Sequence, residues 1–160
     1  MLLIAYDGSP DARSAVEHAG ELQPGEAATI LVVWEPFVEL MTHTGAGFGY
    51  APDMVDSQAI DTASEAAARQ RADEGVELAR AAGLDPVARV RPQERTIGHT
   101  VVAEAGAVDA RAIVMGTRGL TGVKSLLLGS VSHGVLQHAD RPVIVVPSPE
   151  VVKERTARSL

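Results

Sequence analysis

The sequence contains no cysteine among its 160 residues. It therefore holds no disulfide framework, no thiolate metal site and no cysteine nucleophile. Aromatic residues are also scarce, at 3% of the chain, whereas hydrophobic residues as a whole make up 46%. The core must therefore be aliphatic, and the many valine, isoleucine, leucine and alanine residues are typical of strands covered by helices.

Long apolar runs and an excess of basic residues are missing as well. No run approaches the length that crosses a membrane, and the N-terminus enters a strand directly, so we expect a cytoplasmic protein with no membrane partner. The net charge of -7 argues against general nucleic-acid binding, which depends on lysine and arginine neutralising phosphates. The length fits one domain, which we expect over 1–148, followed by a C-terminal tail over 149–160 that is frayed or forms a short helix.

Strand and helix patterns alternate along the chain. The patterns predict strands near 2–6, 28–34, 87–91, 112–116 and 142–146, and helices near 10–22, 57–83, 98–107 and 130–139. Such alternation builds a parallel sheet with helices on both faces, because each crossover is helical and right-handed. The least ordered segment is 35–57, and we interpret its glycine-rich part, 45–52, as a mobile flap. His43 in this segment is interpreted as a solvated loop residue, since no second histidine lies at ligand spacing.

A glycine-rich segment after the fourth predicted strand points to a ligand. It reads Gly116-Thr117-Arg118-Gly119, then nine residues, then Gly129-Ser130. Glycines allow a close approach of the backbone, and the free amides at a helix N-terminus attract anions, so the segment is suited to phosphate. Ser130 and Ser132 each offer a hydroxyl donor, and either is a candidate N-cap. The alternative is a surface loop whose leucines cover the core.

The pattern Gly-x2-Gly-x9-Gly-Ser resembles that of the ATP-binding branch of the universal stress proteins. The segments 2–9, 107–116 and 141–147 are also similar to that family, and the resemblance covers about residues 1–148. It implies an α/β fold of the adenine nucleotide alpha hydrolase-like kind. Such a fold is a doubly wound, five-stranded parallel sheet of strand order 3-2-1-4-5 with helices on both faces.

In this kind of fold the ligand lies where the strand order reverses, between the carboxyl ends of the first and fourth strands. Asp7 and the Gly116 loop leave those two ends. An acidic residue repels phosphate, so Asp7 is expected to face a ribose hydroxyl or accompany a metal ion. The alternative for Asp7 is an Asx-turn or a helix cap ahead of Ser9.

The resemblance also implies a set of binding residues. Those along the adenosine would be Ala5, Tyr6 and Asp7, with backbone groups of Val33 at the adenine. Those around the phosphates would be Met115, Gly116, Arg118, Gly119, Gly129, Ser130, Val131 and Ser132. The bulky Tyr6 would either stack on the ligand or fill part of its pocket. Strand alternation places the side chain of Trp34 on the opposite face from that of Val33.

The function that follows is an ATP-binding regulatory or stress-response protein with little or no hydrolysis. The ligand would be ATP, or else ADP or AMP, and Mg²⁺ would be carried by the phosphates, since no carboxylate cluster is spaced to hold it. We expect no catalytic residue. Ser132 and His133 are helical neighbours whose side chains point about 100° apart, and no carboxylate is placed to orient the histidine. His99 and His138 are expected to lie away from the phosphates.

Two other functions stay open. The first is a nucleotide-free interaction module of the same fold. The strand 143–146 would be an exposed sheet edge, and such edges pair, so we expect a homodimer through it. The second is a slow ATPase, recognised by turnover. An unidentified protein partner is expected for a regulatory protein.

Overall fold

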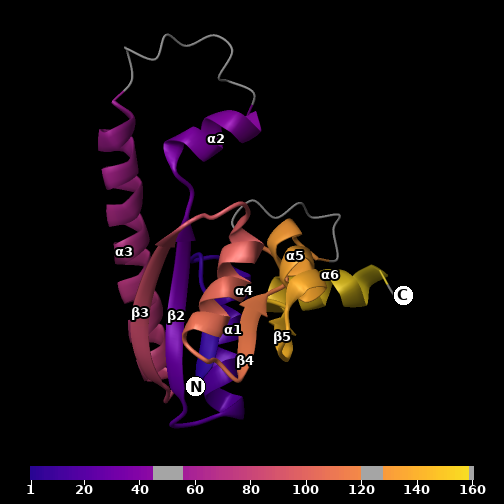
Figure 1. The fold of residues 1–160 in the computed structure, drawn as a ribbon. Helices are drawn as coiled ribbons and strands as arrows, with labels where there is room; N and C mark the ends of the chain where they lie inside the picture. Colours follow the sequence, from indigo (N-terminus) through magenta and orange to yellow (C-terminus); the bar gives the residue numbers. More distant parts are fainter. Residues whose placement is uncertain (45–55, 120–127, 159–160) are drawn as a thin grey trace.

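The computed structural model describes residues 1–44, 56–119 and 128–158, which fold around one five-stranded sheet (Figure 1). The strands are β1 Leu2–Ala5, β2 Ala27–Trp34, β3 Asp85–Pro92, β4 Ala112–Gly116 and β5 Val143–Val146. The helices are α1 Pro10–Leu22, α2 Phe37–Thr44, α3 Ser57–Ala81, α4 Ile97–Ala107, α5 Ser130–His138 and α6 Pro149–Arg158. The strands pair in parallel in the order β3-β2-β1-β4-β5, so the predicted sheet and its strand order are confirmed.

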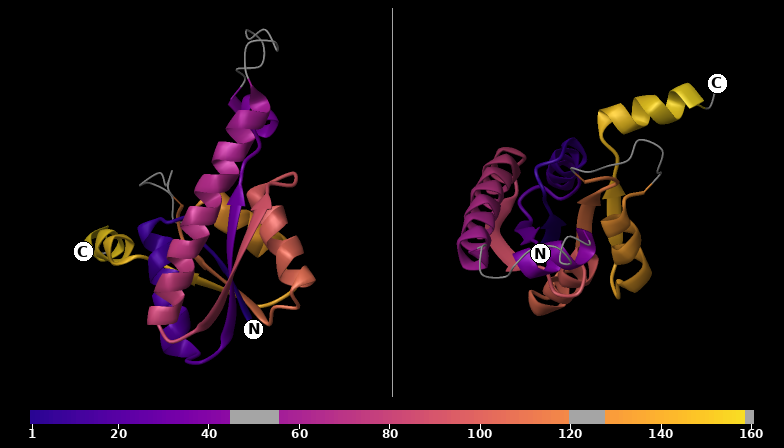
Figure 2. Two further views of the ribbon diagram at one scale, coloured as in Figure 1. Left: turned by 90° about the vertical axis from the view of Figure 1, so that its left-hand side faces the viewer. Right: turned by 90° about the horizontal axis from the view of Figure 1, so that it is seen from above.

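Helices cover both faces of the sheet (Figure 2). Alternate strand residues point to opposite faces, so each face builds its own aliphatic cluster. The first cluster joins the sheet to α1 and α3 and includes Leu2, Ile4, Val16, Ile30 and Ala72. The second joins the sheet to α4 and α5 and includes Leu3, Leu31, Val101, Ile113 and Val135. The expectation of an aliphatic core is confirmed, because the largest fully buried side chains belong to leucine, isoleucine and valine.

The predicted elements differ from the observed ones mainly at their ends. β1 ends at Ala5, one residue before the predicted end, and β3 runs from Asp85 to Pro92 where 87–91 was predicted. α3 ends as its sequence indicates. Ala82 is its C-cap and Gly83 follows with a φ of +87°, the left-handed conformation that glycine adopts without strain.

α2 was not predicted, and it lies in the segment 35–57, for which no helix was expected. Its first turn is completed from α3, because the backbone N–H of Phe37 donates to the Asp61 carboxylate at 2.7 Å. The N–H of Leu40 donates to the carbonyl of Pro36 at 3.0 Å. A helix that depends on a carboxylate 24 residues away carries no local start signal. The predicted flap 45–52 lies outside the described residues, as does 120–127 of the insert between Gly119 and Gly129.

The C-terminal tail forms the short helix α6 rather than a frayed extension. Pro149 opens it, and the Ser148 hydroxyl accepts a hydrogen bond from the N–H of Val151 at 3.4 Å. Val151 is buried, and the helix projects away from the sheet (Figure 2). Among the helices of the described ranges, none is both long and apolar enough to span a bilayer.

Candidate functional site

The carboxyl ends of β1 and β4 lie side by side at the centre of the sheet, where the strand order reverses. Asp7 follows β1, and the segment Gly116–Gly119 ends β4 and follows it. Both border one small cavity of about 110 Å³. The residues that line it are Ala5, Tyr6, Asp7, Ala12, Leu31, Val33, Ile97, Val101, Met115, Gly116, Arg118, Gly119, Val131 and Ser132. The structure thus brings together most of the residues that the resemblance implied.

Two helices hold the segment after β4 in place. From α1, the buried carboxylate of Asp11 accepts hydrogen bonds from the Thr117 hydroxyl and, at 3.1 Å, from the backbone N–H of Arg118. From α5, the buried hydroxyl of Ser132 lies 2.9 Å from the Gly116 carbonyl and 3.3 Å from the Thr117 carbonyl. These hydrogen bonds hold the backbone of residues 116–118 without a ligand, which lowers the entropy cost of binding there.

Two glycines of this segment are required by close contacts. A Cβ at Gly116 would lie 2.6 Å from the Cβ of Asp11, because α1 crosses the end of β4 at that point. A Cβ at Gly119 would lie 2.7 Å from Oδ2 of Asp7. Gly129 closes the loop from the other side, since its N–H donates to the Thr117 carbonyl at 2.7 Å. Side chains at Gly116 or Gly119 would displace α1 or Asp7 from the cavity.

Asp7 forms the Asx-turn that was one alternative for it, and it is not the cap of α1. Its Oδ1 accepts the backbone N–H of Ser9 at 2.9 Å, which is an Asx-turn. The N-cap of α1 is Ser9, whose hydroxyl accepts the N–H of Ala12 at 3.2 Å. The other carboxylate oxygen faces Gly119 across the cavity. The Asx-turn thus aims an acceptor at the point where β1 and β4 diverge.

The ring of Tyr6 neither stacks in the cavity nor fills it. Tyr6 is buried in the cluster on the α1 and α3 face, and its hydroxyl donates to Glu74 of α3 at 3.0 Å. The ring packs closely against Gly75 of α3, where an added Cβ would lie 2.9 Å from the Cδ1 atom of Tyr6. Burial, followed by the hydrogen bond to Glu74, raises the pKa of Tyr6 to about 12. Val33 and Trp34 pack on opposite faces, as alternation predicted.

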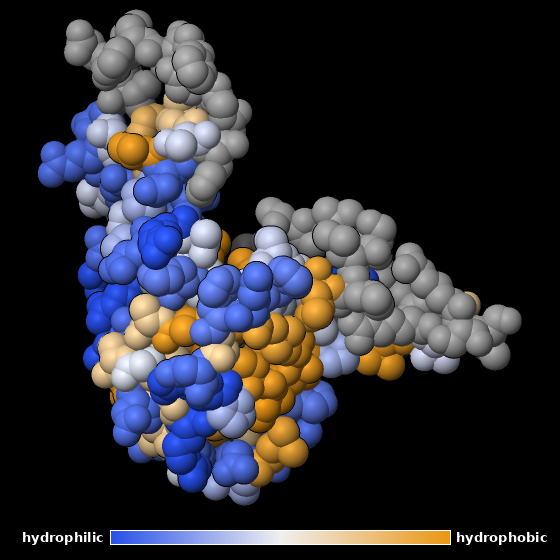
Figure 3. Space-filling model, turned by 45° about the vertical axis from the view of Figure 1, so that its right-hand side comes forward, coloured by the Kyte–Doolittle hydropathy of each residue, from blue (hydrophilic) through white to orange (hydrophobic). Residues whose placement is uncertain are grey.

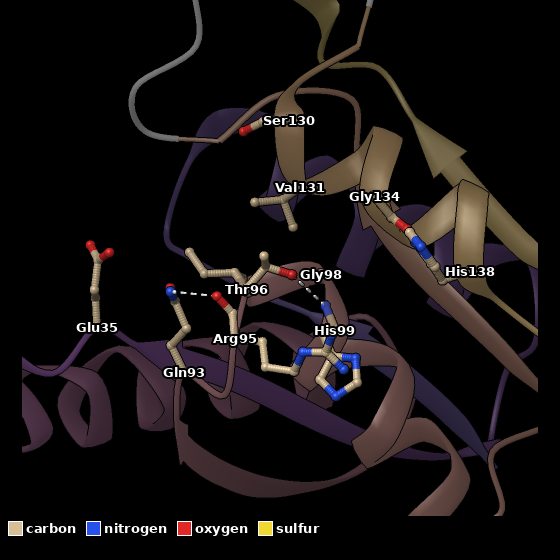
Figure 4. Close-up of a pocket in the computed structure, with 11 residues that line it drawn as sticks. Glu35, Gln93, Arg95, Thr96, Gly98, His99, Ser130, Val131, Gly134 and His138 are labelled. Atoms are coloured by element: carbon tan, nitrogen blue, oxygen red, sulfur yellow. Dashed lines mark hydrogen bonds between the residues drawn. The ribbon is translucent and has the colours of Figure 1, made fainter. Parts of the chain in front are cut away.

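The start of α5 corrects one expectation about the two serines. The N-cap of α5 is Gly129, with no side-chain capping bond, so neither Ser130 nor Ser132 caps the helix. The hydroxyl of Ser132 binds the loop carbonyls. Ser130 is exposed and borders a second, larger cavity of about 530 Å³ together with Val131 (Figure 4). Among the described residues, no side chain caps the first amides of α5, and free amides at a helix start are the arrangement that binds anions.

Two histidines border the second cavity. His99, in the first turn of α4, and His138, in the last turn of α5, line the same cavity as Ser130. The sequence could not indicate this, because the contact depends on α4 packing closely along α5. A Cβ at Gly98 would lie 3.3 Å from the carbonyl of Val131.

Sequence reasoning missed Asp11 and Thr117. These two residues hold the segment after β4 through the Asp11 carboxylate, and neither lines the small cavity. Asp11 lies in the first turn of α1, where acidic residues are common simply because they favour the helix dipole. Its burial and its loop contacts come only from the fold. Within 1–44, 56–119 and 128–158, no three or more histidine, aspartate or glutamate residues are grouped to hold a metal ion.

Comparisons with known proteins find relatives over nearly the whole chain. The model of the universal stress protein family matches residues 1–147. A universal stress protein of Thermus aquaticus is 33% identical over 148 residues, which covers 91% of this chain and 96% of that protein. A universal stress protein of Bacillus subtilis, YxiE, is 28% identical over 154 residues, covering 91% of this chain and 97% of that protein.

Solved structures share the fold. The structure of hypothetical protein MJ0577 superposes with a TM-score of 0.72 at 21% identity, over 91% of this chain and 94% of that chain. The universal stress protein of Archaeoglobus fulgidus in complex with dAMP has a TM-score of 0.56 at 21% identity, over 91% and 95% of the two chains. A universal stress protein in complex with cAMP has a TM-score of 0.56 at 22% identity, over 91% and 94%.

Proposed function

Because this chain belongs to the universal stress protein family, we propose that it binds an adenine nucleotide at the β1–β4 junction and acts as a nucleotide-switched regulatory protein. The observation that carries the proposal is the convergence of Asp7 and the Gly116–Gly119 segment on one cavity beside the uncapped start of α5. A nucleotide needs a ribose acceptor, a close backbone approach and an anion site, and these three features supply them. The dAMP and cAMP complexes of similar proteins support the same ligand class.

The proposed ligand is ATP, with Mg²⁺ carried by its phosphates, and little or no hydrolysis. Residues 5–7 would lie along the adenosine, Val33 at the adenine, and the loop with the start of α5 around the phosphates. Occupancy would change the arrangement of the loop and α5, and a partner protein would read that change. A cytoplasmic location belongs to the proposal, since that compartment supplies the nucleotide. The domain would comprise 1–148 and the tail 149–160.

A homodimer through β5 is also part of the proposal. β5 is the last strand in the sheet order, and an apolar groove of about 590 Å³ runs beside it between α1 and α6. Leu22 and Val152 at this groove are 59% and 47% exposed. Figure 3 shows apolar surface gathered on the side of the molecule turned forward from the right of Figure 1. Exposed strand edges beside apolar surface favour pairing with a second copy.

Two measurements test the nucleotide proposal. The purified protein is denatured and any released nucleotide is identified by chromatography, and Mg-ATP is then titrated calorimetrically into nucleotide-free protein. We expect bound or added ATP to be detected with the wild type and lost with Gly119→Val, because the new side chain collides with the Asp7 carboxylate. Gly106→Ala in α4 is the matched control, since its Cβ would meet only the Arg141 guanidinium, at 3.8 Å.

The results separate the three candidate functions. If no nucleotide is released on denaturation and Mg-ATP gives no heat of binding, the nucleotide-free dimeric interaction module becomes the favoured function. Phosphate release during prolonged incubation with ATP, abolished in Asp7→Ala, would indicate a slow ATPase. Binding without phosphate release would support the nucleotide switch.

A further inference from the structure

The cavity of about 530 Å³ adjoins the smaller cavity at the β1–β4 junction, because Ile97 and Val131 line both of them. In Figure 4 the side chain of Val131 points into the larger cavity from α5, and Arg95 and His99 lie on the opposite side. The smaller cavity, about 110 Å³, is below the range of about 300–1,000 Å³ that holds a complete small ligand. A nucleotide whose base enters it must extend beyond it.

Two helix starts face the larger cavity. Thr96 is the N-cap of α4, and the first residues of α4 form one wall. Ser130 and Val131, the first residues of α5, form another, and α5 has no side-chain cap. The partial positive charges of the two helix starts therefore add in one space, which favours negative charge there. The Ser130 hydroxyl adds a further donor.

Arg95 brings a full positive charge to the same space. It lies in the turn between β3 and α4 with a φ of +61°, a left-handed conformation that is uncommon for residues other than glycine. Its guanidinium forms no ion pair with any of the residues that the structure describes. The one carboxylate that lines the cavity, Glu35, lies at the end away from the Arg95 guanidinium (Figure 4).

Gln93 fixes this turn and offers an acceptor of its own. The residue is 7% exposed, and its side-chain Nε2 donates to the Arg95 carbonyl at 3.4 Å. Its Oε1 accepts no hydrogen bond within the described part of the chain, although a buried, unsatisfied acceptor costs about 1–3 kcal/mol. The hydrogen bond from Gln93 to the Arg95 carbonyl therefore holds in place the turn that carries the Arg95 guanidinium.

We propose that this cavity receives the terminal phosphates of the nucleotide, with Arg95 as their anchor, so that the chain selects adenosine di- and triphosphate over AMP and cyclic AMP. The inference rests on the proposed function and adds its ligand preference. A guanidinium binds phosphate oxygens through paired hydrogen bonds, and those are stronger than hydrogen bonds between neutral groups. AMP and cyclic AMP end before Arg95 and gain nothing from it.

The test compares AMP, cyclic AMP, ADP and ATP by calorimetry at pH 8, with Mg²⁺, on the full chain and on Arg95→Gln. We expect Arg95→Gln to weaken ATP binding about tenfold, which corresponds to about 1.4 kcal/mol, and to leave AMP binding unchanged within about twofold. Arg95→Gly is the second variant. Glycine accepts the positive φ, so this variant folds at least as well as the wild type and should lose the same ATP affinity. Arg69→Gln on the exposed face of α3 removes one charge elsewhere and is the control.

Each result decides between the two proposals. If none of the four nucleotides binds, the proposed function fails, and this inference fails with it. If AMP and ATP bind the wild type equally, or if Arg95→Gln weakens both by the same factor, the nucleotide site stands and the phosphate anchor is refuted. If Arg69→Gln weakens ATP binding as much as Arg95→Gln does, the effect is one of net charge, and Arg95 is not the anchor.

Discussion

The carboxylate of Asp11 in α1 accepts the backbone N–H of Arg118, 3.1 Å away, in the segment that follows β4. The same carboxylate accepts the Thr117 hydroxyl, and the side chain is buried. A residue on the first helix therefore fixes the conformation of a loop more than a hundred positions later in the chain. Asp11 does not need to touch the ligand to influence its binding.

Asp11→Ala should lower the free energy of unfolding by about 1–3 kcal/mol, because it leaves the buried Thr117 hydroxyl and the part-buried Arg118 N–H without their acceptor. It should also weaken ATP binding about tenfold, since the loop must then be ordered by the ligand. Urea denaturation and calorimetry measure the two effects. Asp11→Asn retains one acceptor oxygen and should be intermediate in both. Glu17→Ala, on an exposed position of the same helix, is the control. Wild-type ATP affinity in Asp11→Ala would show that Asp11 stabilises the fold without ordering the site.

The strands and helices of the sheet could be predicted because they rest on patterns that are local in sequence, whereas the strand order came from the resemblance to the universal stress proteins. Apolar runs such as 112–116 are read directly, and Gly83 marks the end of α3 through its own backbone preference. The convergence of Asp7 with the loop also followed, since parallel strands present their carboxyl ends at one edge. These features need no knowledge of which side chains meet.

The features that could not be predicted depend on contacts between distant residues. α2 begins where Asp61 of α3 reaches the N–H of Phe37. Gly129 is the N-cap of α5, although serine has the higher intrinsic preference for that position and two serines lie nearby. One of them, Ser132, is engaged instead with the loop carbonyls. His99 reaches the larger cavity only because Gly98 lets α4 pack closely on α5.

The outer edge of β5 gives a prediction about assembly. The N–H groups of Ile113 and Thr117 donate to the carbonyls of Pro142 and Val146. Alternate residues of a strand direct their backbone groups to opposite sides, so the N–H and C=O of Val145 point away from β4. In a two-fold symmetric dimer each lost hydrogen bond counts twice. Val145→Pro, which removes this N–H, should therefore raise the dimer dissociation constant at least about tenfold.

Sedimentation equilibrium at micromolar concentration measures this change. Val145→Ala is the matched control, because it trims the same side chain and keeps the N–H donor, so it should remain dimeric. Nucleotide binding should change by less than about twofold in both variants, because the Val145 N–H points away from β4, whereas the site lies between β1 and β4 on the other side of that strand. A wild-type chain that sediments as a monomer would contradict the dimer, and an equal effect of the two substitutions would contradict pairing through the strand backbone.

The phenol of Tyr6 predicts how the stability of the fold responds to alkaline pH. Burial, then the hydrogen bond to Glu74, raises its pKa to about 12, whereas in an unfolded chain tyrosine ionises near about 10. The stabilisation from the neutral phenol is therefore complete below about pH 10 and is lost as the pH rises toward about 12. Tyr6→Phe should lower the free energy of unfolding at pH 7 by about 1 kcal/mol, through the lost hydrogen bond. It should also flatten the decline in stability between these two pH values.

Urea denaturation of the two proteins measures the difference at pH 7, below this window, at pH 10, where it begins, and at pH 11.5, within it. Glu74→Gln is the informative control. It keeps an acceptor for the phenol and removes the nearby negative charge, and since burial is the largest cause of the raised pKa, most of the alkaline decline should persist in this variant. A Tyr6→Phe protein with the same alkaline decline as the wild type would mean that other groups cause it. If Glu74→Gln removes the alkaline decline in stability as fully as Tyr6→Phe does, the raised pKa of Tyr6 is caused by the Glu74 carboxylate and not by burial beneath α3.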